Sequence, residues 1–214
     1  MWRLILLIAL PLSLAAQHPF TPAPRVNVTL YVMSRCPDAR TCEAVFEQVL
    51  GSQSVQNKVH LKMNYIATRN ASEPLGYTCK HGALECVGNA HQLCLHKHLP
   101  LPTFYANLGC QNRDFADIGK LSLTKRCADA SGVDWNASGV GACIEGSEAE
   151  ALLQNNLAQT IADGVTMSCT ISIDSTIMRG ARRCTVDGGM WSGCNDGHTA
   201  ADFVRVIQEE WRHL

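Results

Sequence analysis

Two cysteines near the amino-terminal end of the sequence have the neighbours that thiol–disulfide chemistry requires. Cys36 lies between an apolar segment, residues 26–33, and an amphipathic segment that begins shortly after it. A cysteine at the start of a helix has free backbone amides and the helix dipole beside it, and both stabilise the thiolate, which is the reactive form. Arg35 and Arg40 also favour the thiolate, whereas Asp38 opposes it. We therefore expect Cys36 to be a nucleophile.

Cys42 is the candidate for a second, resolving thiol, and its position allows two interpretations. In a continuous helix the rise between residues 36 and 42 is about 9 Å, beyond the roughly 7 Å that a disulfide can span between α-carbons. If the helix instead begins after a cap at Thr41, residues 36–42 form a loop that can bring the two sulfurs together. Thr41 is a good N-cap residue, so we predict the loop. Cys42 would then resolve a mixed disulfide on Cys36, with Cys169 as the alternative resolving thiol.

The segments on either side of Cys36 predict a buried strand followed by a helix. Residues 26–32 are apolar on both faces of an extended chain, which is typical of a strand inside a covered sheet. Apolar residues at helical spacing run from Cys42 to Leu50. A second alternating segment, residues 58–66, completes a strand–helix–strand unit. We expect its two strands to be parallel and joined by a right-handed crossover.

The carboxyl-terminal part of the sequence predicts the remaining elements of the same sheet. The expected elements are a helix at residues 147–162, strands at 169–173 and 183–186 (with 176–179 competing for the second), and a last helix after Thr199. Capping boxes are expected at Ser147 with Glu150 and at Thr199 with Asp202. Without residues 79–146, the order of strands and helices resembles that of thioredoxin-like folds. The predicted fold class is α/β.

Residues 79–146 differ from the rest of the chain and predict a helical insertion held by disulfides. The segment contains six cysteines, short apolar runs, two prolines (Pro100 and Pro102) and several glycines. Helices are expected at residues 85–99, 121–130 and 136–143. We predict two disulfides: Cys127 with Cys143 across a tight turn, and Cys184 with Cys194 around a second turn. The predicted divisions are residues 1–16 (signal peptide), 17–25 (lead-in), 26–78 and 147–214 (the two parts of the sheet domain) and 79–146 (the insertion).

Several features indicate the secretory pathway. Residues 1–16 have the charge, the short apolar run and the small residues of a cleavable signal peptide. All 11 cysteines follow it, and their number is odd, so at least one is unpaired in a monomer. Glycosylation sequons stand at Asn27, Asn70 and Asn136. The net charge of -1 and the lack of a basic run do not indicate a nucleic-acid partner. No membrane association is expected after signal removal.

The insertion contains a motif with fixed spacing. Its fixed residues are Cys79, His81, Gly82, Glu85, Cys86, Asn89 and Cys94. The motif resembles the signature of the gamma-interferon-inducible lysosomal thiol reductase family: Cys-x-His-Gly, two residues, Glu-Cys, two residues, Asn, four residues, Cys. Lys80 stands where the family usually has glutamine. The resemblance extends more loosely from Val26 to the last helix.

The resemblance implies a thioredoxin-like fold with a helical insertion, and the reduction of protein disulfides in acidic endosomes or lysosomes or after secretion. Two features depart from the family pattern. The family's usual redox pair is Cys-x-x-Cys, but Ala39 stands at the fourth position from Cys36. Residues 165–170 also contain no proline, although thioredoxin-like enzymes usually carry a cis-proline before this strand.

Two functions are open on this evidence. One is a secreted or lysosomal (vacuolar) thiol reductase that acts on disulfide-containing proteins or peptides through Cys36 and Cys42. The other is a catalytically silent binding or chaperone-like protein on the same fold. We expect no cofactor, although an external thiol such as glutathione can serve as reductant. Cys79, Cys86 and Cys94 lie near four histidines, but in a secreted chain disulfides are expected rather than a metal site.

Overall fold

A single five-stranded sheet forms the centre of the protein. The computed structural model describes residues 23–73 and 75–214, so the predicted signal peptide (1–16) and most of the lead-in lie outside the described residues. The strands are β1 (Val26–Val32), β2 (Val59–Tyr65), β5 (Thr170–Ser175), β6 (Gly180–Asp187) and β7 (Met190–Ser192), in the order β2-β1-β5-β6-β7. β1 and β2 are parallel, as the crossover predicted, and the other neighbours are antiparallel.

β1 lies between β2 and β5 in the sheet, and both of its faces are covered. Every residue of the strand except Asn27 is buried, which explains why apolar residues occupy both of its faces. Helix α1 (Pro37–Gly51) follows β1, and helix α7 (Ala200–Trp211) packs against α1, with the rings of Phe46 and Phe203 5.2 Å apart. The capping box predicted at Thr199 with Asp202 is confirmed.

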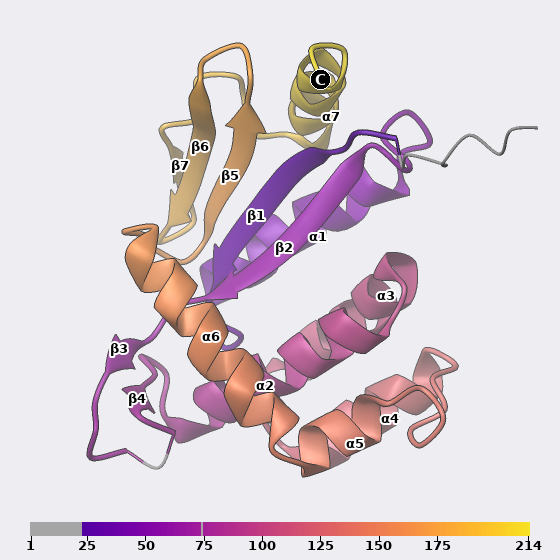
Figure 1. Cartoon of the computed structure of the whole chain (residues 1–214), viewed down its shortest axis with the longest axis vertical. Helices are drawn as coiled ribbons and strands as arrows, with labels where there is room; N and C mark the ends of the chain where they lie inside the picture. The colour runs from indigo at the N-terminus through magenta and orange to yellow at the C-terminus, as the bar shows by residue number, and fades with distance from the viewer. Residues whose placement is uncertain (1–22, 74) are drawn as a thin grey trace, which may run out of the picture.

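A group of helices lies beside the edge strand β2, below the sheet in Figure 1. The elements are the hairpin β3 (Thr68–Arg69) and β4 (Tyr77–Thr78), helices α2 (Ala83–His98), α3 (Leu101–Arg113), α4 (Leu121–Ala130) and α5 (Val140–Glu145), and a 3-10 turn at Phe115–Asp117. The long helix α6 (Glu148–Ala162) returns the chain to the sheet. These elements confirm the thioredoxin-like fold with a helical insertion after the second strand.

Helix α6 is joined to the end of β2 by one side chain. The Asn156 Oδ1 atom accepts a hydrogen bond from the Tyr65 amide at 2.7 Å, and its Nδ2 donates to the Met63 carbonyl at 2.8 Å. An edge strand has unpaired backbone groups, so this amide continues the hydrogen bonding of β2. The capping box predicted at Ser147 is not formed, since the Ser147 side chain makes no capping hydrogen bond.

Five disulfides join the elements within the described residues. They are Cys42–Cys169, Cys79–Cys86, Cys94–Cys143, Cys110–Cys127 and Cys184–Cys194. The predicted Cys184–Cys194 pair is confirmed. The predicted Cys127–Cys143 pair is wrong, because each cysteine is bonded to a helix that lies outside the expected antiparallel pair: Cys127 to α3 and Cys143 to α2.

A helix that crosses a bilayer must be both long and apolar. Within residues 23–73 and 75–214, no helix combines the length and the apolar character that a bilayer crossing requires. The most extended apolar run of the sequence, residues 4–16, belongs to the part that the structure does not describe.

Candidate active site

Cys36 occupies the N-cap position of α1, directly after the turn that ends β1. Its side chain is 5 % exposed, and its Sγ lies 3.6 Å from the Ser168 carbonyl oxygen. Cys36 is the only cysteine outside a disulfide among the described residues. The one free thiol of this part of the chain is therefore carried by the residue that precedes the free amides of the first helical turn, although it makes no capping hydrogen bond to them.

The loop predicted over residues 36–42 is wrong. Helix α1 begins at Pro37, whose missing N–H costs nothing at a first helical position. Cys42 lies on the buried face of the helix, fully shielded from solvent, and its sulfur is bonded to Cys169 rather than placed beside Cys36. The predicted N-cap at Thr41 is replaced by a weaker contact, in which the Thr41 hydroxyl donates to the Pro37 carbonyl one turn earlier at 3.4 Å.

Two signature residues hold the backbone immediately before Cys36. The Asn89 Oδ1 atom accepts from the Ser34 amide at 3.0 Å, and the Glu85 carboxylate accepts from the Arg35 amide at 3.3 Å. Both side chains are fully buried in α2. The Ser34 hydroxyl also donates to the Glu85 carbonyl at 3.1 Å. The signature is therefore in contact with the turn that carries Cys36, although it lies about fifty positions later in the chain.

His81 and Gly82 build the start of α2. The Glu85 carboxylate accepts from the His81 amide at 3.2 Å and lies 2.5 Å from His81 Nδ1. Gly82 has a φ of 88°, in the region that favours glycine. The Cys79–Cys86 disulfide closes this turn, and Cys94 anchors the same helix to α5. His81 therefore holds the turn before Gly82 through its contacts with Glu85.

Gly88 was not singled out from the sequence, yet it permits the close approach of α2 to the Cys36 turn. A β-carbon at this position would lie 2.7 Å from the Ser34 hydroxyl oxygen and 2.7 Å from the Ile118 side chain. Such distances are shorter than van der Waals contact, so a larger residue would push α2 away from Ser34. No sequence pattern at Gly88 or Ser34 indicates this contact.

The charged residues around Cys36 are each engaged elsewhere. Arg35 donates from Nη1 to the Ile118 carbonyl at 3.0 Å, and Arg40 stacks over the Phe115 ring. Asp38 accepts hydrogen bonds from the Gly188 and Gly189 amides, at 3.0 and 2.8 Å. The turn between β6 and β7 therefore neutralises part of the negative charge that would oppose a thiolate at Cys36.

Ser168 directly precedes Cys169, which stands where a thioredoxin-like enzyme usually carries its cis-proline. The Ser168 hydroxyl accepts from the Met33 amide at 2.9 Å, and the peptide bond from Ser168 to Cys169 is cis. The same residue presents its carbonyl oxygen to Cys36. Ser168 thus links the end of β1, the start of β5 and the free thiol.

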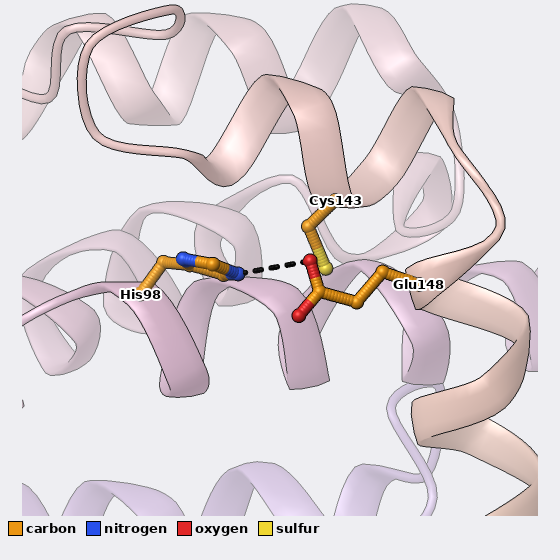
Figure 2. Close-up of side chains that lie close together, drawn as sticks. All are labelled: His98, Cys143 and Glu148. Carbon is orange, nitrogen blue, oxygen red and sulfur yellow. Dashed lines mark hydrogen bonds and ion pairs between the residues drawn. The ribbon is translucent and has the colours of Figure 1, made fainter.

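A second cluster of reactive side chains lies far from Cys36, between α2, α5 and α6. Figure 2 shows His98, Cys143 and Glu148 converging, with His98 Nε2 3.2 Å from a Glu148 oxygen. The Cys143 sulfur is bonded to Cys94, so it is not available as a thiolate ligand. Lys97 also pairs with Glu148, at 2.5 Å. The cluster holds three helices together.

The three sequon asparagines differ in their surroundings. Asn27 lies in β1 and donates to Asp174 at 3.0 Å, whereas Asn70 donates to Thr78 at 2.9 Å. Asn136 is exposed in the loop before α5. Glycosylation at these positions stays a prediction.

Comparison with known proteins identifies the family. Residues 27–131, about half of the chain, match the sequence model of the family described as Gamma interferon inducible lysosomal thiol reductase (GILT). The chain carries a GILT domain. The match includes β1, Cys36 and the whole signature, as the motif at Cys79–Cys94 predicted.

Curated relatives of the GILT domain are distant. The chain is 25% identical over 151 residues to Gamma-interferon-inducible lysosomal thiol reductase of Mus musculus, covering 70% of this chain and 60% of the relative. It is 28% identical over 148 residues to a Gamma-interferon-inducible lysosomal thiol reductase-like protein of Anopheles gambiae, covering 62% of this chain and 59% of that protein. The chain therefore spans about six-tenths of the length of these relatives.

Two solved structures have a fold similar to that of this chain. A putative protein disulfide isomerase from Nitrosomonas europaea is similar with a TM-score of 0.59 at 11% identity, covering 88% of this chain and 98% of that one. Reduced DsbA1 from Neisseria meningitidis has a TM-score of 0.52 at 16% identity, covering 94% of each chain. At this identity the likeness establishes the thioredoxin-like, DsbA-like fold.

Removing the Glu85 carboxylate is expected to destabilise the GILT domain and loosen the Cys36 turn. Glu85→Ala leaves the amides of Arg35 and His81 without their acceptor, at a cost of roughly 2–4 kcal/mol in unfolding free energy. Glu85→Gln retains one acceptor oxygen and should lose less. Urea unfolding measures the stability, and the iodoacetamide rate at Cys36 should rise in the order wild type, Gln, Ala. Equal stability and equal rates in all three proteins would contradict this role.

Glu43 is a buried carboxyl on α1, and its protonation should make stability depend on pH. Burial raises the pKa of Glu43 from 4.5 to about 7, against the lowering effects of the Asn112 hydrogen bond and of Arg40. The folded state therefore binds this proton more tightly than the unfolded state, so its contribution is present at acidic pH and is lost as pH rises from 4.5 to about 7. His91 acts in the opposite direction, since burial lowers its pKa to about 4.

Glu43→Gln is expected to remove the Glu43 part of this pH dependence. Above the folded pKa the variant should be more stable than wild type by at most about 3 kcal/mol, and the two should converge at acidic pH. Urea unfolding from acidic to mildly alkaline pH measures the difference. Glu150→Gln, on the exposed side of α6, should leave the profile unchanged. A difference between wild type and Glu43→Gln that is constant across pH would contradict the prediction.

Proposed function

We propose that the chain is a thiol–disulfide oxidoreductase of the secretory pathway that reduces disulfides of proteins or peptides through Cys36. The observation that carries the proposal is the single free thiol at the N-cap of α1, held by the signature residues of a thiol reductase family. A thiolate in this position is stabilised by free backbone amides. The names of the relatives agree with this chemistry.

The reaction proceeds by three successive thiol–disulfide exchanges. The Cys36 thiolate attacks one sulfur of the substrate disulfide, forms a mixed disulfide and releases the other sulfur, which takes up a proton. A small external thiol then displaces the second substrate thiol from Cys36, and a second external thiol regenerates the Cys36 thiolate. Two external thiols are oxidised to one disulfide while one substrate disulfide is reduced to two thiols.

The external thiol, rather than Cys42, resolves the mixed disulfide on Cys36 in this proposal. Cys42 is bonded to Cys169 and is buried on the inner face of α1, so it offers no thiolate while that disulfide is closed. Resolution by Cys42 would first require reduction of this bond. We therefore propose an external thiol as the resolving group, with Cys42 as the alternative that the experiments below separate.

A silent binding protein on the same fold is the second candidate. It is favoured by the low exposure of Cys36, since a side chain that is 5 % exposed must become accessible before it attacks a substrate. The five disulfides suit an oxidising compartment for either function. We propose secretion or delivery to the lysosomal lumen as the location.

Reduction of a peptide disulfide by the purified protein tests the proposal. The wild-type chain is incubated with glutathione and a fluorescent peptide disulfide at acidic and neutral pH. The control is the same protein after alkylation under non-reducing conditions, with a single adduct on Cys36 confirmed by mass spectrometry. Acceleration by the wild type alone is expected. No acceleration with glutathione, cysteine or dithiothreitol would favour the silent binding protein.

A further inference from the structure

A pocket of about 440 Å³ lies between α1 and α3 and begins one residue from Cys36. The two helices run in opposite directions along it: Arg40 lies over the Phe115 ring just after α3, Glu43 is bonded to Asn112, and Glu47 lies beside Gly109. Its volume is within the range of pockets that hold small-molecule ligands. None of the signature residues lines this pocket.

Two residues that line this pocket each have a buried polar atom without a partner. One is the Oε1 atom of Glu43, and the other is the hydroxyl of Tyr105; neither has a hydrogen-bond partner among the described residues. The other Glu43 oxygen accepts from Asn112 Nδ2 at 2.7 Å. Glu43 and Tyr105 are 3 % and 5 % exposed. Leaving a buried polar atom unpaired costs free energy, so such atoms commonly mark a site that a ligand or water completes.

The charges in the pocket are separated along its length. Arg40 and Arg113 both line the pocket, and neither forms an ion pair within the described part of the chain, although Arg40 stacks over the Phe115 ring. Glu43 and Glu47 lie farther along α1. A guanidinium binds a carboxylate well, and a carboxylate binds an ammonium group. The pocket therefore matches a molecule that carries a carboxylate at one end and an ammonium group at the other.

We propose that this pocket binds the small thiol that regenerates Cys36, a zwitterionic peptide thiol of the size of glutathione. Its ammonium group is recognised by Glu43 and Tyr105, and its carboxylate by Arg40 and Arg113. This inference rests on the proposed function, in which two such thiols are oxidised to one disulfide for each substrate disulfide reduced. The position next to Pro37 places the reductant on the same end of α1 as the thiol that it serves.

Binding is tested with S-methylglutathione, which has the charges of glutathione but no thiol and cannot react with Cys36. Isothermal titration calorimetry on the full wild-type protein at mildly alkaline pH, above the Glu43 pKa of about 7 so that this carboxylate is charged, should show saturable binding. Glu43→Gln and Tyr105→Phe should each weaken it, Glu43→Gln by at least about tenfold, since a hydrogen bond to a charged group is lost. N-acetylation of the ligand, which removes the ammonium group, should weaken binding to wild type to a similar degree. Glu150→Gln on α6 is the matched control and should bind as wild type does.

The outcomes separate the pocket from the proposed function. No saturable binding, or equal binding by wild type, Glu43→Gln and Tyr105→Phe, overturns the pocket assignment even if Cys36-dependent reduction is observed. Folding of each variant is checked by circular dichroism, and Tyr105→Phe keeps the test decisive if Glu43→Gln does not fold. Binding of S-methylglutathione without any Cys36-dependent reduction of the peptide disulfide would contradict the proposed function, and with it the reductant role of the pocket.

Discussion

Replacing Cys36 with serine is expected to lower the rate of disulfide reduction to the rate of the uncatalysed reaction with the external thiol. A serine hydroxyl does not ionise at physiological pH and cannot form a mixed disulfide, whereas its size is close to that of the thiol. Cys36 is also the one free thiol within residues 23–73 and 75–214, so no other described sulfur can replace it in the folded, oxidised protein. The measurement is the initial rate of peptide-disulfide reduction at acidic and neutral pH.

The control for this variant is a protein that keeps Cys36 but lacks the Cys42–Cys169 disulfide. Cys42→Ala/Cys169→Ala should retain turnover if an external thiol resolves the mixed disulfide. If Cys42 resolves it, the double variant should instead accumulate a substrate adduct on Cys36, visible by mass spectrometry. Full activity of Cys36→Ser would exclude Cys36 as the nucleophile and with it the proposed mechanism.

The second large effect concerns the stability of that double variant. The Cys42–Cys169 disulfide joins residues 127 positions apart. In the chain-entropy model, closing such a loop stabilises the folded state by about 4–5 kcal/mol, after allowance for the shorter paths that the disulfides inside the loop provide. Because native proteins are stable by only about 5–15 kcal/mol, the loss is a large share of the total.

Urea unfolding without reductant tests this expectation. The matched control is Cys184→Ala/Cys194→Ala, which opens a loop of separation 10 and should cost only about 3 kcal/mol in the same entropy model. The melting temperature of Cys42→Ala/Cys169→Ala should fall by roughly 10–15 °C. A smaller loss in this variant than in the control would contradict the entropic argument.

The architecture could be predicted because its signals are local and redundant. The apolar run of β1, the helical spacing after Cys42 and the capping box at Thr199 each correspond to an observed element. The Cys184–Cys194 pair was also predictable, since a single turn brings the two residues together. Local patterns suffice where neighbours in sequence are neighbours in space.

The disulfides that cross between elements could not be predicted in the same way. Helix α3 was not expected, because Pro100 and Pro102 suggested an interruption, although proline is tolerated in a first helical turn. Without α3 the helical partner of Cys127 was hidden, and Cys143 was assigned to it by proximity in sequence. The partner of Cys42 lies on β5, which only the folded sheet brings near.

The candidate site was predicted in part. The motif indicated which residues matter but not what they contact: Glu85 and Asn89 hold the amides before Cys36 through hydrogen bonds that span about fifty positions. Thr41 favoured a later helix start, yet Pro37 begins α1 because the burial of Ala39, Cys42 and Phe46 on one face stabilises the first turns. Tertiary packing here overrides a capping preference.

The Cys42–Cys169 disulfide also makes the segment between these residues a covalently closed ring that contains all of the insertion. A protease that cuts once at any position from residue 43 to 168 opens this ring but releases no fragment, because the two products remain joined through the disulfide. The exposed turns before α5 can therefore be nicked while both halves of the sheet stay attached. In a compartment rich in proteases, the two halves produced by such a nick would separate only after reduction of both disulfides that span it, Cys42–Cys169 and Cys94–Cys143.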